Sequence, residues 1–231
     1  NIYASLMFGN FIKEHKDSIE YAYIFPSRNK NRSKNDEIKF LLSLYGYFGF
    51  LRKLIQTLIF KFTNSKSIAI GKLLTEEGIS FDFYSSITNK DFITHYRGIS
   101  PEIAIVALPH IVPNEVINIP SIGTFNKHSS ILPNYKGVYP VFWQMLNGEK
   151  QLGISVHKMT EGIDEGKVVF QKAFVRDLSK SFDENYLFII ENTSKVLSES
   201  IIHIKEGTTQ TISKNQKSAY YSFPKKQDIK N

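Results

Sequence analysis

The run EIAIVAL at residues 102–108 constrains the fold of this chain more than any other segment. Its six consecutive apolar residues lack the polar alternation of a half-exposed strand, and such runs are typical of a strand buried on both faces of a parallel sheet. Parallel strands need long crossover connections, and helical segments alternate with strand segments before this run. The sequence therefore predicts an α/β fold with a doubly wound, mostly parallel sheet flanked by helices.

The other expected elements follow from apolar periodicity, from the positions of Gly and Pro, and from polar loops. In chain order they are a strand at 1–8, a short helix at 11–15, a strand at 19–25, a flexible loop at 27–36, helices at 40–62 and 67–77, a strand at 79–84, helices at 91–96 and 140–147, strands at 152–159 and 168–175, and a long helix at 183–205. Gly78 is expected to cap the helix at 67–77. No repeat or internal linker divides the chain, so we expect a single catalytic domain over residues 1–231 with a short C-terminal extension.

The composition excludes several classes of site. The chain has no cysteine, which removes disulfides, zinc–thiolate sites, iron–sulfur clusters and cysteine nucleophiles. Lys and Arg number 29 against 22 Asp and Glu, and the formal net charge of +7 favours anionic ligands such as nucleotides and phosphates. No charged and then apolar signal peptide opens the sequence, so the cytoplasm is the expected location.

The most apolar stretch, residues 40–62, has to be weighed as a membrane segment. Arg52 and Lys53 divide it into uncharged runs of twelve and seven residues. Both runs are shorter than the roughly 18 residues needed to span a bilayer. We therefore expect no stable membrane insertion, and favour a buried helix or an oligomer interface.

The segment FNKHSSILPNYKG at 125–137 places an amide and an imidazole at the end of a predicted strand. Asn126 and His128 are two residues apart, so their side chains are expected on the same face of the strand. Two convergent polar groups at a strand end, followed by a loop with Pro and Gly, indicate a functional site. Taken singly, such residues are more often turn or hydrogen-bonding residues.

This segment, together with GISVHKMTEGIDEGKVVFQ at 153–171, resembles the paired signature of the formyltetrahydrofolate-dependent formyltransferases. That signature has an Asn-x-His strand end, a Ser-x-Leu-Pro-x-x-Lys/Arg-Gly loop and a later Asp-x-Gly loop. The resemblance extends over residues 102–224. It implies an enzyme with a Rossmann-like formyltransferase fold, an N-formyltransferase that uses N10-formyltetrahydrofolate as co-substrate and needs no metal.

Carried over position by position, the family's catalytic trio falls on Asn126, His128 and Asp164. In this chemistry an acceptor amine attacks the formyl carbon and creates a tetrahedral intermediate with a negative oxygen. Asn126 is expected to donate to that oxygen. His128, whose ordinary pKa is about 6.5, is expected to take the proton of the amine or to stabilise the intermediate. Asp164 would orient or tune His128, or relay a proton through water, and the sequence leaves these roles open.

The same resemblance implies two groups of binding residues around the trio. Contacts to the folate are expected at Phe83, Tyr84, Ser85, Leu108, Pro109, His110, Ile111, Val112, Glu161, Gly162 and Ile163. Contacts to the acceptor are expected at Ser129, Lys136, Gly137, Tyr139 and Trp143. The aromatic residues equally suit core packing.

Four acceptor classes share this chemistry. Methionyl-tRNA formyltransferases add a C-terminal RNA-binding domain, and only ten residues follow Tyr221, so no nucleic-acid substrate is expected. Glycinamide ribonucleotide formyltransferases carry a Gly/Ser-rich phosphate loop after the first strand, where this chain reads SLMFGNFIKEH. Formyltetrahydrofolate hydrolases usually have an N-terminal regulatory domain with no counterpart in this sequence.

The sugar N-formyltransferases are the remaining class, and HSSILPNYKGVYPVFWQMLNGE at 128–149 is most similar to them. The resemblance implies formyl transfer to a nucleotide-linked amino sugar for lipopolysaccharide O-antigen synthesis, with dTDP-4-amino-4,6-dideoxyglucose as the expected acceptor. It also implies a homodimer, for which residues 40–62 offer an apolar surface. A catalytically inactive formyltransferase-like protein that binds a nucleotide is the alternative from another class.

Overall fold

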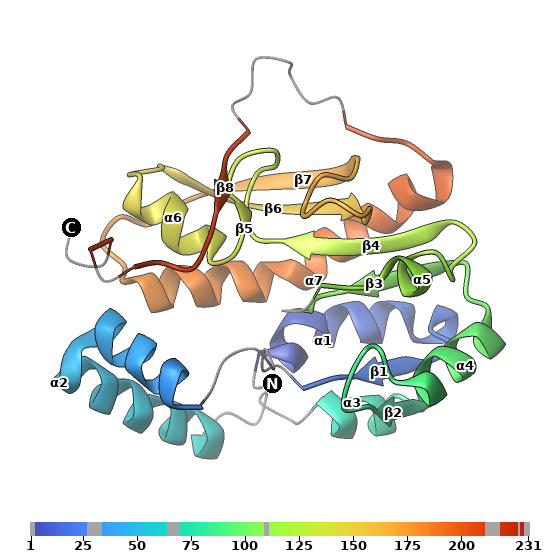
Figure 1. Ribbon diagram of the computed structural model, residues 1–231, viewed down its shortest axis with the longest axis horizontal. Helices are drawn as coiled ribbons and strands as arrows, with labels where there is room; N and C mark the ends of the chain where they lie inside the picture. The colour runs from blue at the N-terminus through green and yellow to red at the C-terminus, as the bar shows by residue number, and fades with distance from the viewer. Residues whose placement is uncertain are drawn as a thin grey trace.

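The main sheet has four strands in the order β3–β4–β6–β7. They are β3 (Ile103–Val106), β4 (Gly123–His128), β6 (Gln151–Lys158) and β7 (Val168–Val175). β3 and β4 are parallel, whereas β6 runs antiparallel to both of its neighbours. Helices flank these strands (Figure 1), as expected for an α/β fold. The computed structural model describes residues 3–26, 34–63, 70–108, 111–210, 218–225 and 227–228.

Two shorter parallel pairs lie beside the main sheet. β1 (Ala22–Ile24) pairs with β2 (Phe81–Phe83), and β5 (Lys136–Gly137) pairs with β8 (Tyr220–Tyr221). The strands expected at 19–25 and 79–84 are therefore present in shorter form. β8 holds a segment from near the end of the chain against the loop that follows β4 (Figure 1).

The helices match most of the expected segments. They are α1 (Ala4–His15), α2 (Lys34–Thr63), α3 (Ile70–Glu76), α4 (Lys90–Ile99), α5 (Asn114–Ile117), α6 (Pro140–Leu146), α7 (Phe182–Glu206) and the short 3-10 helix η1 (Lys16–Ser18). α7 begins with a capping box between Ser181 and Glu184 and ends at Gly207 in the left-handed conformation. Its ends are therefore set by local sequence, which explains why the expected helix at 183–205 is nearly correct.

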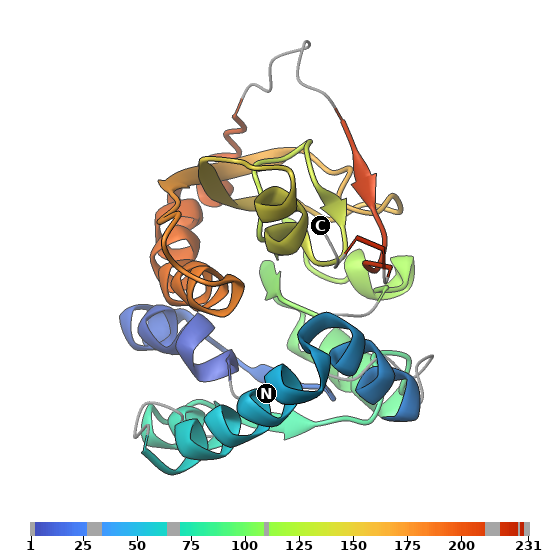
Figure 2. The same ribbon diagram turned by 90° about the vertical axis from the view of Figure 1, so that its left-hand side faces the viewer.

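The main core lies between the sheet and the helices α1 and α7, which run alongside each other in Figures 1 and 2. Phe125 of β4 and Ile154 of β6 pack there against Ile189 and Leu197 of α7. Ile154, Ile189 and Leu197 are fully buried. This packing fixes β4, the strand that carries Asn126 and His128.

The expected strand at 1–8 is wrong, because the chain forms α1 over Ala4–His15. Met7, Phe11 and Ile12 are buried at the spacing of one helix face. α1 packs on α7, where the hydroxyl of Ser194 donates to the carbonyl oxygen of Met7 at 2.9 Å. The alternation of apolar residues in this segment therefore reflects a helix that is anchored by tertiary contacts. Residues 1 and 2 lie outside the described part of the chain.

α2 begins at Lys34, inside the loop expected at 27–36, and residues 27–33 lie outside the described part of the chain. Gly46 interrupts α2 with φ 66° and ψ 174°, a conformation that favours glycine. The side chains of Tyr47 and Phe48 are 73% and 85% exposed, so this face of α2 is not part of the core. Among the described residues, no helix combines the length and the apolar character that crossing a bilayer requires.

Candidate active site

The carboxyl end of β4 carries the amide and the imidazole that the sequence singles out. Phe125 points into the α7 core, so Asn126 and His128, one and three positions later, point to the opposite face of the sheet. The register with β6 sets Asn126 opposite His157. The two-residue spacing thus places both side chains on one face, at the end of a strand that is held on both sides.

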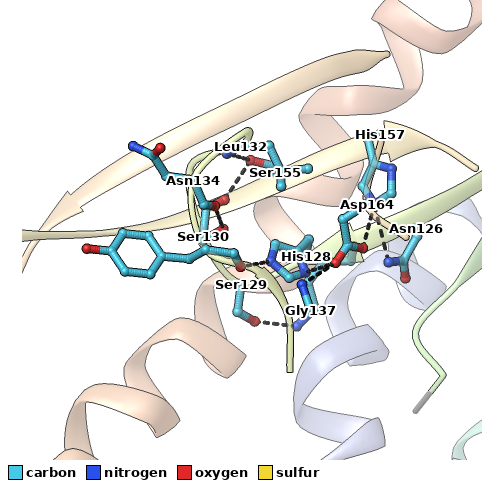
Figure 3. Close-up of polar contacts among 12 residues, drawn as sticks. Asn126, His128, Ser129, Ser130, Leu132, Asn134, Gly137, Ser155, His157 and Asp164 are labelled. Carbon is cyan, nitrogen blue, oxygen red and sulfur yellow. Dashed lines mark hydrogen bonds and ion pairs between the residues drawn. The ribbon is translucent and has the colours of Figure 1, made fainter. Parts of the chain in front are cut away.

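Asp164 approaches these residues from the loop between β6 and β7. Its backbone has φ 51°, a left-handed conformation that aspartate adopts more readily than most residues. Gly166 lets the loop cross β6, because a Cβ there would overlap the carbonyl oxygen of Lys158. Oδ2 of Asp164 accepts a hydrogen bond from the backbone N–H of Gly137 at 2.8 Å and lies 3.5 Å from Nδ1 of His128 (Figure 3).

His128 is fixed by a short hydrogen bond from its Nε2–H to the carbonyl oxygen of Tyr135, at 2.7 Å (Figure 3). Tyr135 has φ 57°, a left-handed backbone conformation at the residue that supplies this carbonyl. Because Nε2 keeps its proton for this bond, the neutral ring has its lone pair on Nδ1. Nδ1 faces Asp164, so it is the atom placed to accept a proton, with a carboxylate beside it to stabilise the imidazolium.

Burial and neighbouring charges set the protonation states of the site. Burial lowers the pKa of His128. The charge of Asp164 and the hydrogen bond to the Tyr135 carbonyl both raise this pKa, but the effect of burial is larger. Burial alone would raise the pKa of Asp164, but the hydrogen bond with His157, the charge of His128 and the N–H of Gly137 together lower it to about 2. At neutral pH the site therefore holds an ionised carboxylate beside a neutral imidazole, the pairing that a general base needs.

The lowered pKa of His128 predicts the pH dependence of the reaction. We expect kcat/KM to be level around neutral pH and to fall about tenfold per pH unit once the pH drops below the pKa of His128, because only the neutral ring accepts a proton. This acid limb lies below the ordinary histidine pKa of about 6.5. The unfolded chain also binds this proton more tightly than the folded one, so the free energy of unfolding declines as the pH falls from that value. A pH profile of kcat/KM checks this, and a limb centred above pH 7 would contradict a neutral His128.

His157 is a site residue that the sequence analysis does not include. It is 2% exposed, and its Nε2 lies 3.4 Å from Oδ1 of Asp164 and 3.3 Å from Nδ2 of Asn126 (Figure 3). It links the amide to the carboxylate and completes a continuous row of Asn126, His157, Asp164 and His128. The available signal is a histidine in the strand at 151–158, whose interior is buried, but only the β4–β6 register brings it to Asn126.

Lys127 lies between Asn126 and His128 in sequence and projects to the other face of β4. Its Nζ donates to Oγ of Ser129 at 2.9 Å, and burial lowers its pKa to about 8. Ser129, an expected acceptor contact, is itself 8% exposed and holds this amine. A largely desolvated lysine therefore lies directly behind the row of polar residues.

The loop after β4 is held by buried hydrogen bonds. The hydroxyl of Ser155 on β6 donates to the carbonyl oxygen of Ser130 at 2.6 Å and accepts from the N–H of Leu132 at 3.1 Å. The hydroxyl of Ser130 donates to the carbonyl oxygen of Asn134 at 2.8 Å. These bonds define the path of the loop up to Tyr135, whose carbonyl orients His128.

The two expected acceptor aromatics contact the end of the described chain. Trp143 donates its indole N–H to the carbonyl oxygen of Ser222 at 3.0 Å, and its ring lies 4.9 Å from that of Tyr221. Tyr139 lies 5.6 Å from Phe223, measured between ring centroids. Both residues therefore hold the 220–223 segment against α6. This is a packing role, the alternative to acceptor binding that the sequence analysis gives for aromatic residues.

The two other expected acceptor residues lie beside the Asp164 loop. Nζ of Lys136 is 3.5 Å from Oε1 of Glu165, and Gly137 gives its N–H to Asp164. Gly137 has φ 93°, and a Cβ there would overlap the carbonyl oxygen of Tyr221, so only glycine fits this crossing. These contacts join the loop after β4 to the loop after β6.

The expected folate positions fall on three separate loops or strand ends. Phe83, Ile111 and Ile163 are 68%, 80% and 46% exposed, whereas Val112 is buried. Tyr84 and Leu108 pack against the α4 core, and Ser85, Glu161 and Gly162 complete the described positions. Pro109 and His110 lie outside the described part of the chain. Exposed apolar side chains at these ends are the kind of surface on which a flat aromatic ligand can lie.

An amide donor, an unprotonated Nδ1 and an ionised carboxylate at a strand end of an α/β fold define a site suited to acyl-group transfer without a covalent enzyme intermediate. Among the described residues, no cluster of three or more His, Asp or Glu side chains is arranged to hold a metal ion. The chain belongs to the formyl transferase family, which residues 60–209 match. This match includes Asn126, His128, His157 and Asp164.

Methionyl-tRNA formyltransferases are among the proteins that this chain resembles in sequence. The protein of Thermodesulfovibrio yellowstonii is 33% identical over 140 residues, which are 60% of this chain and 44% of that protein. The protein of Thermotoga maritima is 30% identical over 146 residues, which are 62% of this chain and 47% of that protein. The chain thus spans less than half the length of these relatives.

Solved structures of formyltransferases share the fold at low sequence identity. Glycinamide ribonucleotide transformylase 1 from Symbiobacterium toebii has a TM-score of 0.59 at 13% identity, covering 89% of this chain and 83% of that one. WlaRD, a sugar 3N-formyl transferase solved with dTDP and 5-N-formyl-THF, has a TM-score of 0.52 at 19% identity, covering 88% and 69%. A sugar N-formyltransferase from a Shewanella species has 0.54 at 18%, covering 88% and 76%. These likenesses confirm the Rossmann-like formyltransferase fold.

Proposed function

We propose that this protein is an N-formyltransferase that transfers a formyl group from N10-formyltetrahydrofolate to the amino group of a nucleotide-linked amino sugar. The observation that carries the proposal is the row of Asn126, His157, Asp164 and His128, in which the free Nδ1 of His128 faces an ionised carboxylate. Membership of the formyl transferase family supports the folate-type donor. The protein itself contributes positioning and electrostatics.

The residues of the row have defined tasks in the first step. The acceptor amine attacks the formyl carbon, a C–N bond forms, and the carbonyl electron pair moves to the oxygen. Nδ1 of His128 takes the proton that the amine loses, and Asp164 stabilises the imidazolium so formed. An amide N–H of Asn126 donates to the negative oxygen.

The second step releases the products. The electron pair on the oxygen re-forms the carbonyl, the bond from carbon to N10 breaks, and N10 takes the proton held by His128. The products are the formamide and tetrahydrofolate, and His128 returns to its neutral state. One histidine therefore serves as base and then as acid, which requires its pKa to lie near the working pH.

Two observations support a sugar nucleotide as the acceptor. Sugar N-formyltransferases are among the proteins with this fold, and one of them was solved with dTDP. The formal net charge of +7 favours an anionic acceptor such as a sugar diphosphate. We take dTDP-4-amino-4,6-dideoxyglucose as the first candidate, in a cytoplasmic pathway to lipopolysaccharide O-antigen.

Methionyl-tRNA is the second candidate acceptor. It is favoured by relatives that are 30–33% identical and named for that substrate. Glycinamide ribonucleotide is a third, named for a protein with the same fold. That protein is 13% identical to this chain, below the 18–19% of the sugar N-formyltransferases, so we rank this acceptor third.

A product assay separates these acceptors. The protein is incubated with N10-formyltetrahydrofolate and, separately, with dTDP- and UDP-linked 3-amino and 4-amino sugars, methionyl-tRNA or glycinamide ribonucleotide. Mass spectrometry then detects the addition of one formyl group. Formylation of one sugar nucleotide supports the proposal, whereas formylation of the tRNA or the ribonucleotide alone overturns the acceptor. Binding of a nucleotide with no product and no folate turnover would mark an inactive formyltransferase-like protein.

We also propose that the exposed apolar face of α2 is a homodimer interface. Phe48, Leu51 and Leu58 are 85%, 47% and 54% exposed. Single exposed apolar residues are common on protein surfaces, but several that gather on one helix face mark an interaction site. Phe48→Glu is expected to halve the particle mass measured by light scattering, because a buried unpaired carboxylate disfavours association. Ile202→Glu on α7, where Ile202 is 61% exposed, is the matched control and leaves the mass unchanged. If the wild-type protein is a monomer, the proposal that this face of α2 is a homodimer interface is wrong.

A further inference from the structure

β1 and β3 each have a hydrogen-bonded partner on one side only among the described residues. β1 pairs with β2, β3 pairs with β4, and the two pairs belong to separate sheets. A cavity of about 560 Å³ separates them and is lined by β1 and β3 along their whole lengths. In Figure 1 the two strands lie on neighbouring levels below β4. We call the cavity between them the strand slot.

The backbone groups that face the strand slot follow from the hydrogen bonds on the other edges. Ala22 donates its N–H to Ser80, and Ile24 accepts from Tyr84, so both residues point toward β2 and its flanks. Tyr23, between them, therefore turns its N–H and C=O to the slot.

The opposite wall of the slot is arranged in the same way. Glu102 accepts from Ile122 and Gly123 on the β4 side. The alternation along β3 then turns the N–H and C=O of Ile103 and Ile105 to the slot. Two rows of backbone donors and acceptors thus face each other across one cavity, and such groups are nearly always paired where they are shielded from water.

The sequence of β3 does not fit the edge position that it has in the sheet. EIAIVAL at 102–108 is apolar on both faces, as in the interior of a parallel sheet, whereas strands at an edge usually carry charges or proline. In the structure β3 is the last strand of the β3–β4–β6–β7 sheet. A further strand in the slot would give β3 the second neighbour that its sequence predicts.

The lining of the slot specifies the side chains of its occupant. Phe8 and Phe11 of α1 line one side, and Phe92 and Tyr96 of α4 also line the cavity. An occupying strand is therefore apolar on both faces. The carboxylates that precede the two strands, Glu20 and Glu102, also line it, together with Lys205 of α7. Two carboxylates against one ammonium favour a basic residue at the amino end of the occupant.

The position of α1 indicates how such a strand is connected. α1 leads through η1 directly into β1, so α1 runs back along β1 and its first turn lies toward the carboxyl end of that strand. A strand in the slot that continues into α1 would run parallel to both β1 and β3. Strand, helix and parallel strand then form a β–α–β unit of the right-handed kind found in nearly all such folds.

We propose that the strand slot is the docking site of one additional parallel β-strand, a basic residue followed by about five apolar residues, that leads directly into α1. Each edge of this strand pairs with one wall of the slot. The two strands of the β1–β2 sheet, the four of the main sheet and the added one then form a single sheet of seven. The inference is independent of the acceptor and of the catalytic roles proposed above.

The test adds such a strand to the chain. One fusion places a lysine and five alternating valine and isoleucine residues directly before Asn1, and a control fusion has serine and proline in place of the five. We expect the amides of Tyr23 and Ile105 to exchange with solvent at least about tenfold more slowly in the first fusion than in the control, with a higher Tm. The amide of Ala22, already bonded to Ser80, serves as the internal reference.

Three results would overturn the proposal. Equal exchange at Tyr23 and Ile105 in both fusions would mean that the slot does not accept a strand. If the same apolar peptide, added as a separate molecule, protects the amides of Tyr23 and Ile105 equally well, the strand does not need to be connected to α1. Protection of Tyr23 and Ile105 in the unfused chain that grows with protein concentration would assign the slot to a second copy of the chain.

Discussion

His128→Gln is expected to lower kcat by about 10²–10⁴-fold, the usual contribution of a general base. The side-chain amide of glutamine can still donate to the carbonyl oxygen of Tyr135, which Nε2 now contacts at 2.7 Å. It offers no basic atom where Nδ1 faces Asp164. The substitution therefore removes proton transfer while it keeps a hydrogen bond that orders the loop. Single-turnover kinetics of tetrahydrofolate formation measures the chemical step directly.

The control for this substitution is His203→Gln on α7, where Nδ1 of His203 lies 3.0 Å from the hydroxyl of Thr208. It is expected to leave kcat unchanged. Thermal unfolding of both variants separates damage to the fold from damage to the chemistry. A loss below tenfold for His128→Gln in a folded protein would mean that the amine loses its proton to water rather than to Nδ1. The acid limb of the pH profile should disappear in the same variant, because no titrating ring remains.

Local signals predicted those elements whose ends are set by caps or prolines. The capping box at Ser181 and the proline at the start of α6 fix helices that the sequence places within one or two residues. The expected strand at 1–8 failed because only the contact of α1 with α7 decides that segment. The break in α2 at Gly46 was also missed, since a glycine within an apolar helix does not reveal its φ angle.

The candidate site could be predicted from the order and spacing of several motifs, but not from any one residue. Asn126, His128 and Asp164 belong to segments with fixed spacing, and the structure brings Asp164 within 3.5 Å of His128. His157 joins them through strand register, a property that the order of residues in one strand does not contain. The protonation states likewise depend on burial of the ring and on the N–H of Gly137, 27 residues before Asp164.

For the run EIAIVAL, the position in the sheet that the sequence predicts differs from the position in the structure. Its composition predicts an interior strand, and the structure has it at the margin of a four-stranded sheet. The cavity beside β3 reconciles the two, because it lies where a second neighbour of β3 belongs. Completing that sheet would also brace β3, which pairs with the strand that carries Asn126 and His128.

Asn126→Ala is expected to lower kcat by about 10²–10³-fold, the usual effect of removing one donor to an oxyanion. The donor acts on charge that develops only in the transition state, so the Kd for the folate changes little. The contact of Nδ2 with His157, at 3.3 Å, is lost as well, but Asp164 keeps its hydrogen bond from Gly137 and its position beside His128.

The pH profile distinguishes this role from a structural one. If Asn126 acts on the oxyanion, Asn126→Ala scales kcat/KM down at every pH and leaves the acid limb of His128 where it was, because the environment of Nδ1 is intact. If Asn126 mainly orders the row through His157, the limb shifts together with the rate. Asn192→Ala, which removes an amide that donates to the carbonyl oxygen of Phe188 on α7, controls for loss of an asparagine elsewhere. An equal loss in folate affinity and in kcat would assign Asn126 to ground-state binding instead.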